Sequence, residues 1–173
     1  NIPATKHDVK AVEYFLRLKL CKTSLKDRLN WLHFALTSED VNSASYALLL
    51  SDGVEKALLP ALLQLQKDLN RLARKEARSV LLARTHGQPA VPTTFGKEIR
   101  VFGYRLSRQI DELKKHSITF KFGGSVGNFN AHMAAFPAVN WPRAARQMAA
   151  RLSRGSKIKL ALSPVTTQVD NRD

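Results

Sequence analysis

The chain has 173 residues, of which 44% are apolar, and this is enough to form a helical core in one or two domains. Its eight glycines and seven prolines are few for this length, which argues against an all-β fold with frequent turns. The single cysteine excludes an intrachain disulfide framework and a cysteine-based metal cluster, and no run of 18 uncharged apolar residues predicts a membrane span.

The formal net charge is +14 at pH 7, and no acidic residue occurs between Leu113 and Val169. A polyanionic partner, such as nucleic acid or a phosphorylated metabolite, would explain this bias. An acidic part of a longer protein that balances this stretch would explain it equally well. The chain begins without methionine and without a secretory signal, so we expect a fragment or a processed product from a reducing, non-secretory compartment.

A first helix is predicted from about Val9 to Leu20, where apolar residues recur at helical spacing. The preceding string Thr5-Lys6-His7-Asp8 has the spacing of a capping box, with Thr5 as the N-cap residue. The same three-residue offset precedes a second predicted helix, whose apolar stripe consists of Leu25, Leu29, Leu32 and Leu36.

A third and much longer helix is predicted from Thr37 to about Ala73, because no polar turn interrupts its apolar periodicity. Pro60 should kink this helix, and Gly53 should weaken it. A helix of about 30 residues, at 1.5 Å per residue, spans roughly 45 Å. Helices of this length usually belong to a bundle or to the core of an oligomer.

The residues Thr85–Pro92 contain one glycine and two prolines and are predicted to form a loop. A helix is predicted over Thr93–Lys115 and a shorter one over Pro142–Leu152. Between them, Phe122–Asn128 is a second glycine-rich loop. It lacks the lysine and the strand–turn–helix context of nucleotide-binding loops, so a tight, closely packed turn is expected there.

Two parts of the chain could carry chemistry by their local sequence. His86 lies in a loop between Thr85 and Gln88, where a proton-transfer residue would have hydrogen-bonding partners and solvent access. An ordinary solvated histidine is the alternative. Lys6 and His7 precede a helix start, where N–H groups and the helix dipole attract anions, but ordinary capping by Thr5 and Asp8 explains the spacing better.

The hydroxyls of Thr37 and Ser38 precede the longest helix, and they could cap it, hold a carboxylate or phosphate, or do both. The remaining histidines, at positions 33, 116 and 132, do not have the spacing of metal ligands. We therefore expect no metal site.

Five strings in chain order resemble signatures of the fumarase/aspartase superfamily and, within it, of the bacterial-type branch of the adenylosuccinate lyase family. They cover Thr5–Tyr14, His33–Asn42, Ala83–Glu98, Gly123–His132 and Val165–Val169. Each string is short, but five of them in order and at compatible distances are hard to attribute to chance. The resemblance extends over essentially the whole chain.

The resemblance implies an all-α fold of the long-helix bundle type. Residues 1–36 would form the end of an N-terminal helical domain, and residues 37–173 the first part of the central bundle domain. It also implies a cytoplasmic homotetramer whose active sites are shared between subunits, with a small nucleotide as substrate. No cofactor, no metal, no membrane contact and no nucleic-acid partner are expected from the family.

The implied reaction is a β-elimination that releases fumarate from adenylosuccinate or from the related succinyl-imidazole-carboxamide nucleotide of purine biosynthesis. By its place in the motif, His86 would be the general acid. The segments Lys6-His7-Asp8 and Thr37-Ser38 would bind the substrate, and Gln168 would contact its succinyl side. The family's serine-bearing loop does not occur in this sequence, so we expect these residues alone to be inactive.

Two alternatives to this interpretation are considered. The first is another lyase or hydratase of the same superfamily, which the string Thr-Ser-Glu-Asp-Val-Asn at positions 37–42 disfavours. The second is a basic, helical nucleic-acid-binding protein, suggested by the net charge, or a non-catalytic scaffold derived from the enzyme, since the base-bearing loop does not occur in this sequence. The sequence contains no recognisable helix-turn-helix, zinc finger or aromatic-basic interleaving that would support nucleic-acid binding.

Overall fold

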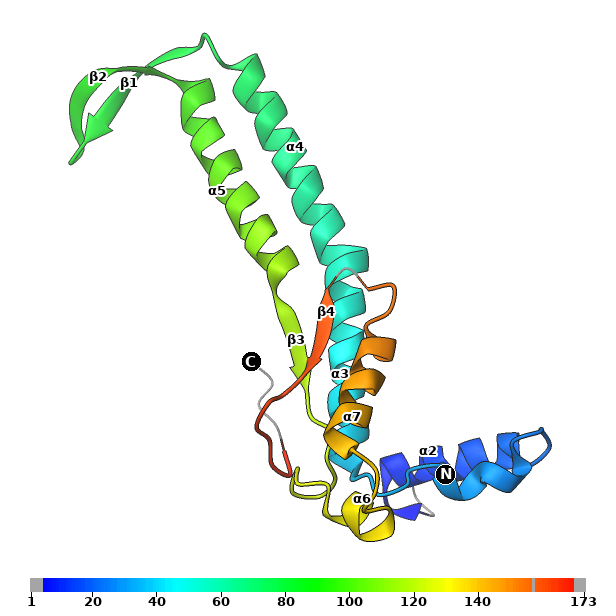
Figure 1. Ribbon diagram of the computed structural model, residues 1–173. Coiled ribbons are helices and arrows are strands. Elements are labelled where there is room, and N and C mark those ends of the chain that lie inside the picture. The colour runs from blue at the N-terminus through cyan, green and yellow to red at the C-terminus, as the bar shows by residue number, and fades with distance from the viewer. Residues whose placement is uncertain (1–4, 157, 170–173) are drawn as a thin grey trace. The chain divides into compact units, whose positions relative to one another are not determined.

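The computed structural model describes residues 5–156 and 158–169, which belong to two compact units (Figure 1). Unit 1 takes its residues from 1–51 and 117–173, and unit 2 consists of residues 52–116. Most described residues are helical, so the predicted helical character is confirmed, but "all-α" is too strict because the described residues also form four short strands. The domain boundary between residues 36 and 37 stays a prediction.

The first helix of unit 1, α2, spans Asp8–Leu20, close to its predicted bounds. Its N-cap is His7 and not Thr5, so the predicted capping box is wrong. Lys6 has a left-handed backbone with φ of 52° and turns the chain just before the helix. The Thr5 hydroxyl instead donates a hydrogen bond of 2.8 Å to the carbonyl of His7, which fixes the approach to the helix.

The second predicted helix is replaced by a six-residue 3-10 helix, η1, at Lys26–Trp31. The chain then turns repeatedly, with left-handed φ values of 59° at His33 and 56° at Ala35. An α-helix cannot continue through such residues. The leucine periodicity in this segment was therefore a misleading signal, and the next helix, α3 (Ser38–Gly53), begins only after these turns.

The long predicted helix is confirmed, with an interruption where Gly53 and Pro60 led us to expect one. α3 is followed by a π-helical segment, η2 (Val54–Leu58), and then by α4 (Leu59–Lys75). The amide of Leu59 bonds to the carbonyl of Val54, five residues earlier. Pro60 has no N–H to donate, and a π-type turn accommodates such a gap in the α-helical pattern.

In unit 2, α4 lies beside α5 (Phe95–Lys115), as Figure 1 shows. Thr94 caps α5 by accepting a hydrogen bond of 3.2 Å from the amide of Lys97. Across the helix pair, the Arg100 guanidinium donates to the side-chain oxygen of Asn70 at 2.6 Å. The predicted helix over Thr93–Lys115 is confirmed to within two residues.

The predicted loop at Thr85–Pro92 is instead a β-hairpin of β1 (Val80–Thr85) and β2 (Gln88–Thr94). His86 and Gly87 form its two-residue turn, with φ of 51° and 75°. Positive φ at both central residues is the geometry that matches the twist of hairpin strands. The prolines suggested a loop, but they are tolerated because each strand of a two-stranded hairpin has an edge without ladder hydrogen bonds.

The core of unit 1 contains a parallel pair of strands, β3 (Ser117–Phe120) and β4 (Lys159–Leu162), packed against α7 (Trp141–Leu152). Its fully or nearly fully buried side chains include Phe120, Ala145, Ile158 and Leu160. A short helix, α6 (Asn130–Ala135), follows the glycine-rich loop. α7 begins one residue before its prediction, whereas four-residue strands are too short to give a periodic signal.

Candidate functional site

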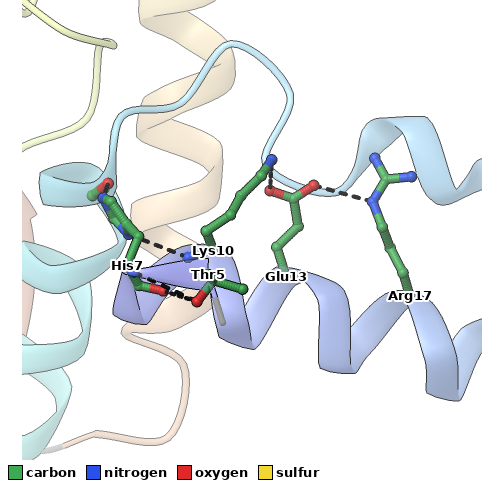
Figure 2. A network of polar contacts seen from close by, with 6 residues as sticks. Thr5, His7, Lys10, Glu13 and Arg17 are labelled. Carbon is green, nitrogen blue, oxygen red and sulfur yellow. Dashed lines mark hydrogen bonds and ion pairs between the residues drawn. The ribbon is translucent and has the colours of Figure 1, made fainter. Parts of the chain in front are cut away.

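Two predicted binding segments meet at His7 in unit 1 (Figure 2). The amide of Lys10 donates a hydrogen bond of 3.4 Å to Nδ1 of His7, which is the capping bond of α2. Nε2 of the same ring lies 3.1 Å from the hydroxyl of Ser38. Since Nδ1 accepts, a neutral ring carries its proton on Nε2 and donates to Ser38. The starts of α2 and α3 are thus joined through one imidazole.

The residues on either side of His7 remain exposed. The carboxylate of Asp8 accepts a hydrogen bond of 2.8 Å from the amide of Val9 and lies 3.4 Å from Nδ1 of His7. The ammonium group of Lys6 forms no ion pair within the described part of the chain. The imidazole of His7 therefore lies beside the hydroxyl of Ser38 and next in sequence to the exposed Lys6, and these are groups suited to binding an anion.

Farther along α2, Figure 2 also shows the buried carboxylate of Glu13 between two basic side chains. Lys10 Nζ lies 2.8 Å from one of its oxygens and Arg17 Nε 3.0 Å from the other. The hydrogen bond from Lys10, together with the one from Arg17, holds the pKa of Glu13 below its ordinary value although burial opposes this. These two ion pairs stabilise α2, and both carboxylate oxygens of Glu13 are already bonded to basic side chains.

Thr37 and Ser38 are held in place by Asp40, which lies in the first turn of α3. The carboxylate of Asp40 accepts a hydrogen bond of 3.0 Å from the amide of Thr37, and the amide of Asp40 bonds to the carbonyl of Thr37 at 3.1 Å. These bonds cap the helix through Asp40, so the hydroxyls of Thr37 and Ser38 are not needed for that purpose. The anion-binding role of these two hydroxyls stays a prediction.

The glycine-rich loop is bound to the same carboxylate. The amides of Gly123 and Gly124 donate to Asp40 at 3.2 Å and 2.9 Å. At Gly127, where φ is 81°, a β-carbon would lie only 2.8 Å from the carbonyl oxygen of Thr166. Glycine is therefore required for this approach. The predicted tight, closely packed turn is confirmed, and it contacts the segment that leads two residues further to the exposed Gln168.

A cavity of about 190 Å³ lies between the start of α3 and this loop. Its polar lining residues are Thr37, Ser125 and Asn130, together with the backbone of Gly124. The positive end of the helix dipole lies at the same place, because α3 begins at Ser38. Hydroxyls, an amide and a helix start form a surface that can bind a small carboxylate or phosphate group.

His132 is a buried feature that the sequence analysis did not identify. Its ring is 1% exposed and packs against aromatic side chains, and neither of its nitrogens has a hydrogen-bond partner among the described residues. The aromatic side chains are Phe34, Phe122, Phe129 and Trp141. Burial lowers the pKa of His132, and the charge of Asp40 opposes that shift only in part. The ring is therefore neutral at pH 7, and no spacing pattern could have predicted its burial.

His86 belongs to unit 2, whereas the other candidate residues belong to unit 1. It occupies the first central position of the β1–β2 turn, with its ring exposed and without a hydrogen bond to the described residues. Arg84 braces the turn by donating to the carbonyl of Gly87 at 3.1 Å. Its left-handed backbone follows from the turn geometry and carries no information about function. That His86 acts together with the residues of unit 1 stays a prediction.

The described residues contain no group of three or more side chains suited to holding a metal ion. In the same part of the chain, no helix is both long enough and apolar enough to cross a membrane. The site itself offers hydroxyls, an imidazole, backbone amides and basic side chains, which are groups suited to acid–base and anion-binding chemistry.

Comparison with known proteins defines the class. A protein family described as lyase matches residues 4–173, and the chain belongs to this family. Among curated proteins it is 41% identical over 170 residues to the adenylosuccinate lyase of Haemophilus influenzae and, over the same length, 41% identical to that of Escherichia coli K12. The adenylosuccinate lyase of Buchnera aphidicola subsp. Acyrthosiphon pisum is 39% identical over 170 residues.

Each of these similarities covers 98% of this chain but only 36% of the relative. The chain thus spans about a third of the length of the curated relatives that it matches. The resemblance to the adenylosuccinate lyase family that the five sequence strings suggested is confirmed.

Proposed function

We propose that these 173 residues are part of an adenylosuccinate lyase, which eliminates fumarate from adenylosuccinate and from the related succinyl-imidazole-carboxamide nucleotide of purine biosynthesis. The observation that carries the proposal is 41% identity, over 98% of the chain, to proteins that bear this name. The geometry of unit 1 supports it, because several anion-binding groups are joined around one cavity.

In the proposed reaction, a base removes a proton from the succinyl carbon next to a carboxylate. The electron pair spreads into that carboxylate, the bond between carbon and the purine-side nitrogen breaks, and fumarate forms. His86 donates a proton to the departing nitrogen as general acid. The base is expected on the serine-bearing loop of the family, which these 173 residues do not contain, so we expect them to release no fumarate by themselves.

The residues of unit 1 would bind the substrate. Lys6, His7 and Asp8 lie at one helix start, and the hydroxyl of Ser38 is bonded to His7 at 3.1 Å. Together with Thr37 they would hold the phosphate or the carboxylates of the nucleotide, and Gln168 would contact the succinyl group. The support for Gln168 is indirect: Thr166, two residues earlier, packs on the loop that lines the cavity wall.

We further propose a cytoplasmic homotetramer without cofactor or metal, with active sites shared between subunits. The side chains that support this lie on α4 and α5 and are apolar but exposed in the single chain: Leu65 is 50% exposed and Phe102 58%. Burial of such residues in a shared helix bundle would remove apolar surface from water. Residues 1–36 would then end an N-terminal domain, and residues 37–173 would begin the bundle domain.

The test is an assay of the complete protein with adenylosuccinate, compared with a His86→Gln variant. We expect fumarate release from the wild type and a decrease in kcat of about a hundredfold or more in the variant, because the departing nitrogen loses its proton donor. His116→Gln is the matched control, since His116 is an exposed histidine of the same unit and should leave kcat unchanged. A wild type inactive on both succinyl nucleotides contradicts the proposal, and a fully active His86→Gln variant contradicts the role of His86.

The alternative is a basic nucleic-acid-binding or scaffold protein. One observation favours it: the arginines of α7 are exposed and have no acidic partner among the described residues. Strong, salt-sensitive retention on DNA by a complete protein that lacks lyase activity would support this alternative.

A further inference from the structure

Asp40 and Lys121 form an ion pair in the interior of unit 1. The ammonium of Lys121 lies 2.9 Å from Asp40 Oδ1, and both side chains are 0% exposed. The same ammonium donates to the carbonyl of Gly124 at 2.8 Å. Neither residue lines the cavity beside the start of α3, so neither is placed to touch a ligand there.

The carboxylate of Asp40 connects the two sides of that cavity. It accepts the amide of Thr37 on the helix side and the amides of Gly123 and Gly124 on the loop side. Lys121 supplies the charge that balances this buried carboxylate, and it holds the far side of the Gly124 peptide through the carbonyl bond. One carboxylate, balanced by one ammonium group, is thus bonded to the backbone on both sides of the cavity.

A second bond strengthens the connection between the same two elements. The amide of Lys121 donates to the hydroxyl of Ser43 at 3.0 Å. Ser43 is buried on α3, three residues after Asp40 and therefore on the same face of the helix. The backbone that enters the glycine-rich loop is therefore bonded to α3 at both Asp40 and Ser43.

An ion pair of this kind is weak evidence for stability, because removing two charges from water costs about as much as their attraction returns. In some proteins such a pair selects one geometry over others, as a polar residue in a helical bundle fixes its register. Because this pair joins the start of α3 to the glycine-rich loop, the geometry concerned is the spacing of the two cavity walls.

We infer that Asp40 and Lys121 are positioning residues that hold Thr37, Ser38 and the Gly124–Ser125 backbone in the arrangement that binds the substrate. The inference rests on the proposed function for its activity readout. It assigns no direct contact with the substrate to either residue. Removal of one charge should move the hydroxyls of one wall relative to the amides of the other.

The main test uses Lys121→Met in the complete protein. A shift of the binding groups by about 1 Å lowers catalytic efficiency on the order of a hundredfold, and we expect this loss in kcat/KM. Most of it should appear as a higher KM, because the displaced groups bind substrate and transition state alike. Lys56→Met is the matched control: Lys56 belongs to an exposed pair with Asp52, so kcat and KM should not change.

Hydrogen exchange supplies a readout that a merely destabilising substitution would not give. In Lys121→Met, peptides covering residues 37–43 and 121–128 should exchange faster, while peptides covering α7 keep the wild-type rate. A general loss of stability would instead raise exchange throughout unit 1.

Ser43→Ala is the second variant, in case Lys121→Met does not fold. It removes one neutral hydrogen bond, and we expect about a tenfold lower kcat/KM with faster exchange in the same two segments. Ser51→Ala is its control, because Ser51 is also buried on α3 but bonds to Ser156 at 2.7 Å, away from the loop.

The inference is overturned if folded Lys121→Met or Ser43→Ala protein keeps kcat/KM within twofold of the wild type. It is also overturned if activity falls while exchange in both segments stays unchanged. An inactive wild type would contradict the proposed function instead. In that case the exchange measurement alone decides whether Asp40 and Lys121 hold the helix start and the loop together.

Discussion

At the scale of single residues, unit 1 buries ionisable groups in two contrasting ways. Asp40 is surrounded by donors, with an ammonium at 2.9 Å and three backbone amides. His132 is surrounded by aromatic rings, the nearest being Trp141 at a centroid distance of 4.8 Å. The first environment favours a charged group and the second a neutral one, because only the first replaces the lost hydration.

The stability of the protein should therefore depend on the protonation of His132. Burial lowers its folded pKa below 6.5, so at pH values under 6.5 the unfolded chain binds a proton more readily than the folded chain. The free energy of unfolding should therefore fall as the pH decreases below 6.5. It should level off once the pH lies below the pKa of His132 in the folded protein. We expect His132→Phe, which keeps an aromatic ring but cannot titrate, to reduce this slope in urea unfolding between about pH 5 and pH 8.

The control for this measurement is His116→Phe, which replaces an exposed histidine. It should leave the pH slope as it is in the wild type. An identical slope in His132→Phe and the wild type would show that protonation of His132 is not linked to unfolding.

At the scale of elements, the helices followed from the sequence and the turns did not. α2, α5 and α7 were predicted within two residues, because each presents apolar side chains at helical spacing and begins or ends near a capping residue or proline. The leucine stripe after residue 24 failed because an α-helix cannot pass through the left-handed residues at 33 and 35, and nothing in the identity of Ala35 indicates a positive φ.

Two glycines with opposite backbone geometry give a matched test. Gly53 is in a helical conformation with φ of −61°, and a β-carbon there would meet no atom within 4 Å. Gly53→Ala should stabilise the protein by roughly 0.5–1 kcal/mol, because the unfolded chain loses conformational freedom. Gly87 also has space for a β-carbon, but its φ is 75°. Gly87→Ala should therefore destabilise the hairpin by about 1 kcal/mol.

Hydrogen exchange of the β1–β2 hairpin and the urea midpoint of the complete protein together measure both effects. The Gly87→Ala cost should appear mainly as faster exchange of residues 80–94, since the hairpin can open without the rest of the unit. Equal changes in the free energy of unfolding for Gly53→Ala and Gly87→Ala would mean that the sign of φ does not determine the effect of alanine at these positions.

At the scale of the whole molecule, the sequence pointed to the segments of the candidate site but not to the contacts between them. His7, Thr37 and Ser38 were found because helix starts have recognisable residues. The contact between His7 and Ser38 joins positions 31 apart, and that between Gly123 and Asp40 joins positions 83 apart. Such contacts depend on tertiary packing, for which a single sequence has no periodic signal. The family resemblance implied a role for each candidate residue, and the structure gave the distances between them.

The proposed shared bundle leads to a prediction about association. Phe102 is 58% exposed on α5, and a charge at this position would be costly to bury in a helix interface. We expect Phe102→Arg to shift the complete protein from tetramers toward smaller species in sedimentation velocity. Asp111→Arg places the same side chain on the opposite side of α5, where the residue is already exposed and charged, and should sediment as the wild type does. A wild type that sediments as a monomer would contradict the proposed assembly.

The close approach of Gly127 to Thr166 constrains how this protein can change through evolution. A methyl group at position 127 would collide with Thr166 of the same chain, so we expect glycine to be retained there. Ser125 and Val126, on the outer side of the same loop, are exposed and can accept other residues without moving the backbone. Homologous enzymes that differ in this loop should therefore differ at these two exposed positions, and of the two only residue 125 lines the cavity and could change what it binds.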